Sequence, residues 1–196
     1  MKFIKQNSYD IVRLFINQMG ITIFSLVLYI SLGAIEDDAT VSSLKIFMSV
    51  FAIGFYLSLL YTAAWEYGAK DKIRIDGGRM EPMPAKGAVM AFCANLPNIA
   101  LALVAIIFAV IYLSTGAEAF NTLFSLLTLI VRFIAAMYHG VLHAALSGFE
   151  SDVVIFNLLQ DVGYALAPLF AIGATQLGYA LGLREKRIRD LFKSKR

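Results

Sequence analysis

Five long apolar segments constrain this chain more than any other feature of its sequence. Each has 20 or more residues, and four of them contain no Asp, Glu, Lys or Arg. About 20 helical residues cross a hydrocarbon layer of about 30 Å, and a helix satisfies its own backbone hydrogen bonds in lipid. The segments are Leu14–Ile35, Ile46–Trp65, Gly87–Ser114, Phe120–Phe149 and Val162–Leu183. The sequence therefore predicts an all-α fold, a multi-pass transmembrane helical bundle in which one or more segments are kinked or re-entrant.

The composition excludes an ordinary soluble domain. Hydrophobic residues make up 59% of the 196 positions and charged residues 16%. A soluble domain of this size has no interior for so many apolar side chains, because most of its residues face water. We expect a single integral membrane domain over residues 1–196, in the cell membrane of a prokaryote. The pI near 9.0 comes from short basic tracts beside the apolar segments, a pattern typical of contact with anionic lipid rather than nucleic acid.

The basic residues also predict an orientation. Three lie at the N-terminus, five in Glu66–Lys86 and seven in the tail from Arg184, whereas Glu36–Lys45 is mainly acidic. Loops rich in Lys and Arg stay on the cytoplasmic side, which places the N-terminus, Glu66–Lys86 and the tail there. Five simple crossings would put the tail on the other side, so the number of crossings stays open. A re-entrant pair within Glu150–Leu183 is one solution.

Two polar connections carry predictions of their own. The tail, residues 184–196, mixes basic and apolar residues and is predicted to be a basic amphipathic helix on an anionic surface. The stretch Lys70–Met80 alternates apolar and charged residues around Asp76-Gly77, which predicts a short hairpin. That hairpin is either a solvated turn, a docking surface or an anion-binding nest beside Arg79. The tail residues expected to contact lipid headgroups are Arg184, Lys186, Arg187, Arg189 and Lys193.

A polar stripe runs along the fourth segment. At about 100° per helical residue, seven positions lie within about 40° of Arg132, and six of them are polar. An arginine inside a membrane is costly, so we expect it to face protein or water, paired with Asp161 or Glu150. The seven positions are Asn121, Ser125, Thr128, Ala136, His139, His143 and Glu150.

Three interpretations of this stripe remain open. It is a dry seam between helices, a water-accessible pocket lined by Arg132, His139 and His143, or a metal site. A metal site needs a third protein ligand from Glu66, Glu150 or Asp161, because the chain has two histidines. We expect no metal and no other cofactor.

The third segment adds two candidate residues for the pocket. Pro97 lies between Asn95 and Asn98 and predicts a kink, because proline removes a backbone donor. The asparagines either satisfy this kink locally or line a binding site near the middle of the membrane. The candidate substrate-binding residues are Arg132, His139, His143, Asn95 and Asn98.

Small residues follow one face of the fifth segment at helical spacing. A face without bulky side chains lets another helix approach closely. That helix belongs either to this chain or to a membrane protein partner. The residues are Gly163, Ala167, Ala171, Ala174, Gly178 and Gly182.

No enzyme motif supports a catalytic function. The chain has no Walker loop, H-E-x-x-H, G-x-S-x-G, C-x-x-C or Rossmann glycine pattern. Our leading hypothesis is a transport-related protein, a substrate-binding or solute-permeation subunit with a polar intramembrane pocket. The alternatives are an accessory subunit of a membrane complex and, third, an intramembrane enzyme. Oligomeric state and substrate are not predicted.

Overall fold

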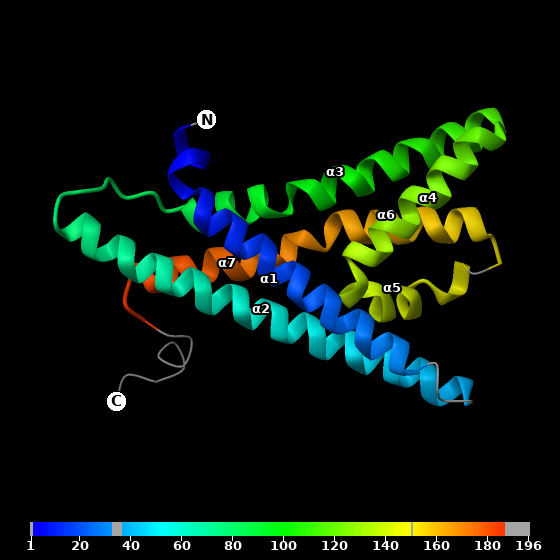
Figure 1. Cartoon of the computed structure of the whole chain (residues 1–196), viewed down its shortest axis with the longest axis horizontal. Helices are drawn as coiled ribbons and strands as arrows, with labels where there is room; N and C mark the ends of the chain where they lie inside the picture. Colours follow the sequence, from blue (N-terminus) through cyan, green and yellow to red (C-terminus); the bar gives the residue numbers. More distant parts are fainter. Residues whose placement is uncertain (1, 33–36, 150, 187–196) are drawn as a thin grey trace. The chain divides into compact units, whose positions relative to one another are not determined.

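The computed structural model describes residues 2–32, 37–149 and 151–186, and this part of the chain is helical without any strand. The all-α prediction is confirmed. Figure 1 shows the elements in chain order. They are α1 (Lys2–Leu32), α2 (Asp38–Asp76), α3 (Lys86–Thr115), α4 (Glu118–Ile134), α5 (His139–Ala145), α6 (Val153–Leu166) and α7 (Pro168–Gly182), with 3₁₀ turns at Ala136–Tyr138 and Ser147–Phe149.

The helices have the length and surface of membrane spans. Four helical spans are long and apolar enough to cross a membrane. A bent pair, α4 with Ala136–Ala145, makes a fifth if the pair is one span. Large apolar side chains cover much of the outer surface; Phe47 and Phe170, for example, are 67% and 68% exposed. Such a surface suits contact with lipid. The four spans are Phe3–Leu32, Thr40–Asp76, Lys86–Thr115 and Val153–Gly182.

The bend lies in the fourth apolar segment and not in the fifth. The axes of α4 and Ala136–Ala145 differ by 86°. Figure 1 shows α4 starting where α3 ends, and α5 leading back to that end, where α6 begins. The re-entrant pair within Glu150–Leu183 is one of the solutions that the sequence leaves open, and the structure argues against it, because α6 and α7 together form the single candidate span Val153–Gly182.

The predicted hairpin at Lys70–Met80 is also wrong, because α2 continues to Asp76. The Gly78 N–H donates to Ile75 O at 2.9 Å, and the Arg79 N–H donates to Arg74 O at 2.9 Å. Gly78 has φ 68°, so this pair of bonds is the Schellman arrangement that ends a helix. The glycines thus end a helix. The alternation of charged and apolar residues that predicted a hairpin lies on the last turns of α2.

Contacts within the chain divide it into two compact units. The first unit contains described residues of Met1–Asn17, Phe55–Ala94 and Leu169–Arg196, and the second contains Gln18–Gly54 and Asn95–Pro168. The boundaries fall inside α1, α2 and α3 and at the junction of α6 with α7.

Glycines of the small-residue face pack against this chain's own helices. A Cβ on Gly178 would lie 2.3 Å from Tyr61 O, and one on Gly182 would lie 2.2 Å from Trp65 O, so α7 rests directly on the backbone of α2 in the first unit. In the second unit, a Cβ on Gly163 would lie 2.6 Å from a methyl carbon of Leu142. A partner chain on this face stays a prediction.

Candidate intramembrane binding site

The second unit brings Arg132 of α4 against the polar face of α6. Arg132 Nη2 donates to Asn157 Oδ1 at 2.5 Å and to Gln160 Oε1 at 2.6 Å. Gln160 is fully buried and Arg132 is partly buried. Both acceptors are neutral amides, so they orient the guanidinium without neutralising its charge.

Asp161, one of the two acids expected to pair with Arg132, has a different partner. The Thr128 hydroxyl donates to Asp161 Oδ2 at 2.6 Å, and both side chains are buried. Within residues 2–32, 37–149 and 151–186, no salt bridge joins Arg132 to a carboxylate. Glu150, the other expected acid, lies outside the described residues. Thr128 and Arg132 nonetheless face α6 from one side of α4, as the stripe predicted.

Six buried polar atoms of this unit have no hydrogen-bond partner in the described part of the chain, and four of them lie on α3, α4 and α6. These four are Arg132 Nε, Gln160 Nε2, Asp161 Oδ1 and Asn98 Nδ2. An unsatisfied buried polar atom costs about 1–3 kcal/mol, and most such atoms in native proteins are paired. Three of the four belong to Arg132 itself, to its acceptor Gln160 and to the adjacent Asp161. The surroundings of the guanidinium are therefore polar, and their hydrogen-bonding groups are incompletely satisfied.

The bend after α4 is held by side chains from α1 and α2. Thr22 Oγ1 donates to Ile134 O at 2.8 Å, which satisfies a carbonyl at the end of α4. The Gly140 N–H donates to Ser49 Oγ at 2.9 Å and to Tyr29 OH at 3.1 Å. The bend is buried, with Met137 at 0% exposure. Irregular backbone is tolerated at membrane depth where protein surrounds it, and this bend meets that condition.

Gly140 also sets how closely α5 approaches α2. A Cβ at this position would lie 2.2 Å from Lys45 O and 2.6 Å from Ser49 Oγ. Only glycine permits this distance, and the bonds from its N–H to Tyr29 and Ser49 depend on the same approach. The fourth segment, Phe120–Phe149, is thus a bent one, as the fold prediction allows: α4 ends at Ile134, and α5 packs against α2.

The two histidines belong to an aromatic cluster. His139 Nδ1 lies 3.0 Å from Tyr164 OH, and the His139 ring meets the rings of Tyr29 and His143 edge-on at 6.0 and 5.7 Å. His143 packs edge-on against Phe156 at 5.4 Å. In the described part of the chain no group of three His, Cys, Asp or Glu side chains could hold a metal ion.

A cavity of about 240 Å³ opens beside this cluster. Its polar lining comes from Arg132, His139 and Tyr29, and the remaining walls are apolar. A second cavity, of about 10 Å³, lies against Asn98 and Tyr164 and is close to the smallest that holds one water. The larger cavity is lined by Leu26, Tyr29, Leu129, Arg132, Phe133, Ala136 and His139.

The structure thus brings together some of the predicted pocket residues. Arg132 and His139 share the larger cavity, whereas Asn98 lines the small one. His143 contacts His139 without lining either cavity, and Asn95 is buried and lines neither. Binding of a substrate by these five residues stays a prediction.

Sequence reasoning missed the partners on α6. Polar residues at 157, 160, 161 and 164 have helical spacing and one common face. That signal is present in the sequence, but three of the four positions lie before Val162, where the fifth apolar segment begins, so the segment does not include them.

Two of the predicted headgroup contacts belong to the described residues of the first unit, where they follow the C-terminal end of α7. Arg184 and Lys186 are exposed and follow α7 in a turn, so these first tail residues are not helical. Trp65 Nε1 donates to Lys186 O at 2.7 Å. Arg187, Arg189 and Lys193 lie outside the described residues.

Comparison with known protein families, with curated proteins and with solved structures finds no match to this chain.

Proposed function

We propose that this chain is a transport-related membrane protein whose second unit binds a small solute with an anionic group. The observation that carries the proposal is the state of Arg132. Its guanidinium borders a cavity of about 240 Å³ and has two neutral acceptors, and its buried Nε has no partner among the residues that the structure describes. A partly buried cation held by neutral groups retains its attraction for an anion.

The surroundings indicate which anion would fit. Leu26, Leu129 and Phe133 supply apolar walls, and Tyr29 and His139 supply polar groups. A carboxylate or phosphate would meet the guanidinium, because its planar fork suits both groups. A short apolar portion of the same solute would lie on the remaining walls. Small organic carboxylates are thus the first class to test.

The bend supports a topology that agrees with the charge distribution. If α4 and α5 enter the membrane and leave it on the same side, the four remaining spans bring both termini of the chain to one side of the membrane. Lysine and arginine counts then place the N-terminus, the loop before Lys86 and the tail in the cytoplasm of a prokaryotic cell. In this arrangement the cavity beside Arg132 lies at the turning point of a re-entrant helix pair, a place where irregular backbone lines binding sites in transporters.

Thermal unfolding of the detergent-purified protein tests the proposal. A panel of small carboxylates and phosphate esters is added, and stabilisation by at least one of them is expected. A solute at 100 times its Kd stabilises by about 2.7 kcal/mol. The same solute should have no effect on Arg132→Gln and its full effect on Arg184→Gln, which changes an exposed arginine beyond α7.

Uptake of the stabilising solute into proteoliposomes then tests transport itself. Stabilisation without uptake would retain binding and contradict permeation by this chain alone. No stabilisation by any member of the panel, or an equal effect on both arginine variants, would contradict the proposal and favour the accessory-subunit alternative.

A further inference from the structure

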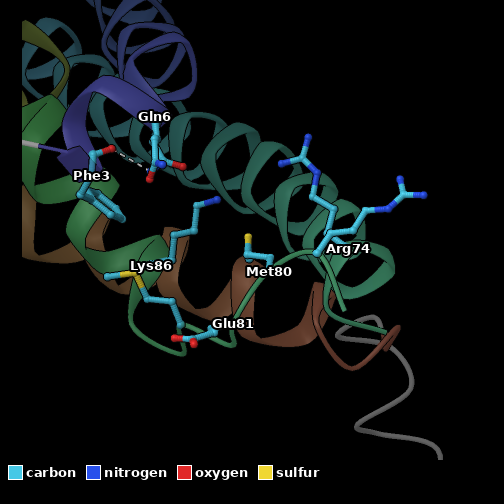
Figure 2. A pocket seen from close by; sticks show the side chains of 9 residues that line it. Phe3, Gln6, Arg74, Met80, Glu81 and Lys86 are labelled. Atoms are coloured by element: carbon cyan, nitrogen blue, oxygen red, sulfur yellow. Dashed lines mark hydrogen bonds between the residues drawn. The ribbon is translucent and has the colours of Figure 1, made fainter. Parts of the chain in front are cut away.

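A third cavity, of about 490 Å³, lies in the first unit, where α2 ends and the chain leads into α3. Figure 2 shows Phe3 and Gln6 on one side and Arg74, Met80, Glu81 and Lys86 on the others. The spans of α2 and α3 end at Asp76 and begin at Lys86, so the connection between them lies outside the hydrocarbon. Arg74 and Arg79 follow the apolar segment that ends at Trp65, and Lys86 directly precedes the one that begins at Gly87, so the lining lies on the headgroup side of the apolar segments.

Three cations line this cavity, and one of them is already neutralised. Lys86 is buried, and its Nζ donates to Asp71 Oδ2 at 2.7 Å. Asp71 is also buried and accepts from Tyr179 OH at 3.0 Å. This carboxylate fixes Lys86 and neutralises it, so the remaining positive charge of the cavity belongs to Arg74 and Arg79.

The two arginines are available to an anion. Arg74 Nη1 lies 3.6 Å from Asp71 Oδ1, but its side chain is 62% exposed. Arg79 forms no salt bridge with any acid that the structure describes. Figure 2 shows the Glu81 carboxylate directed away from Arg74. Two guanidinium groups without a tightly held acid are typical of a phosphate site.

The rest of the lining is amphiphilic. Phe3, Met80 and Met83 present apolar surface, and Gln6 and Asn7 present amides. A free inorganic anion makes no favourable contact with the apolar side chains of the lining. A phospholipid has a phosphate, polar glycerol oxygens and apolar chains in one molecule. The combination of charge, apolar walls and depth therefore favours a lipid ligand.

We propose that this cavity binds the phosphate of an anionic phospholipid headgroup through Arg74 and Arg79, with the glycerol and the first acyl carbons against Phe3, Met80 and Met83. The site is separate from the Arg132 cavity and from the basic tail, and it does not depend on the function proposed for either. Inorganic phosphate shares the chemistry recognised by the arginines and is the competing source.

Native mass spectrometry of the full chain released from detergent micelles tests the site. The probes are dioleoyl phosphatidylglycerol, dioleoyl phosphatidylcholine and inorganic phosphate. We expect one phosphatidylglycerol adduct to form at lower concentration than any phosphatidylcholine adduct. In Arg74→Gln/Arg79→Gln its apparent Kd should rise about tenfold or more, because two charge-assisted hydrogen bonds are lost.

The matched control is Lys5→Gln/Lys70→Gln, which removes the same charge from exposed positions outside the cavity and outside the tail. It should leave the tight adduct unchanged. An equal loss in the control would mean general attraction to a basic surface, and equal binding of phosphatidylcholine would mean apolar adhesion; either result overturns the proposal. Phosphate that binds alone and displaces the lipid would assign the arginines to a free anion and overturn the lipid part.

A second measurement leaves the arginines in place, so it does not depend on folding of the double variant. Glu81→Cys on a Cys93→Ala background puts a thiol on the cavity wall. Dihexanoyl phosphatidylglycerol, which is water-soluble, should slow its reaction with a maleimide, and dihexanoyl phosphatidylcholine should not. Equal rates with both lipids would contradict a headgroup site.

Discussion

The Thr22 hydroxyl donates to the carbonyl oxygen of Ile134, 112 positions further along the chain. This bond joins the middle of α1 to the last residue of α4, at the carbonyl that the helix break leaves without an intrahelical donor. A side chain of α1 thereby satisfies a carbonyl oxygen that would be costly to leave unpaired in lipid.

Thr22→Val should destabilise the protein by about 1–3 kcal/mol, because it keeps the side-chain shape and leaves the Ile134 carbonyl buried without a donor. Thermal or denaturant unfolding in detergent measures the change. Thr62→Val is the matched control, since its hydroxyl bonds to Ser58 O of its own helix and is exposed. Equal effects of the two substitutions would show that the Ile134 bond has no special role.

Gly140→Ala should destabilise by about 1–3 kcal/mol or more, because the added carbon would lie 2.2 Å from the backbone oxygen of Lys45. The backbone of α2 cannot move as a flexible side chain can. Gly20→Ala, which meets nothing within 4 Å, should instead be neutral or stabilising by up to about 1 kcal/mol. Unfolding midpoints of both variants decide the matter, and a stable Gly140→Ala protein would contradict close packing of α5 on α2.

Arg132→Met should destabilise the protein by removing the donor of Asn157 and Gln160. A double-mutant cycle identifies which partner matters. Arg132→Met should show coupling of about 0.5–3 kcal/mol with Gln160→Leu, and the coupling with Asp161→Asn should be smaller, because Asp161 bonds to Thr128. The opposite order would restore the ion pair with Asp161 that the sequence first indicated.

Lys86→Met should destabilise by about 3–5 kcal/mol, since it leaves Asp71 buried without the nearest cation. Asp71→Asn introduced with Lys86→Met should recover part of this loss. Lys72→Met provides the control, because its partner Asp76 is exposed, and little change is expected. Equal free energies of unfolding for Lys86→Met and Lys72→Met would contradict this prediction and would mean that water solvates Asp71.

Cysteine labelling distinguishes the re-entrant arrangement from five crossings. On a Cys93→Ala background, Ser147→Cys should react with an impermeant reagent in intact cells, whereas Lys186→Cys should react after the cells are opened. Both positions are exposed. The reverse pattern would mean that α4 and α5 cross the membrane as one broken span.

The apolar segments could be predicted from sequence because a membrane span is a local property of about 20 residues. The bend could not, since Ile134–Tyr138 contains neither proline nor glycine. It depends on Thr22, Ser49 and Gly140, which come from separate helices, and no local pattern reports such contacts. The sequence predicts the polar face that includes Arg132 but not the partners of Arg132. An arginine in an apolar segment suggests an acidic partner more strongly than two amides.

The bond from Trp65 Nε1 to Lys186 O has a practical consequence. Trp65 is the single tryptophan of the chain, so the indole fluorescence of the whole protein comes from the point where α7 gives way to the basic tail. Vesicles that contain anionic lipid and engage the residues after Lys186 should therefore shift the emission of an unlabelled protein, and titration of that signal would measure tail binding in the native chain.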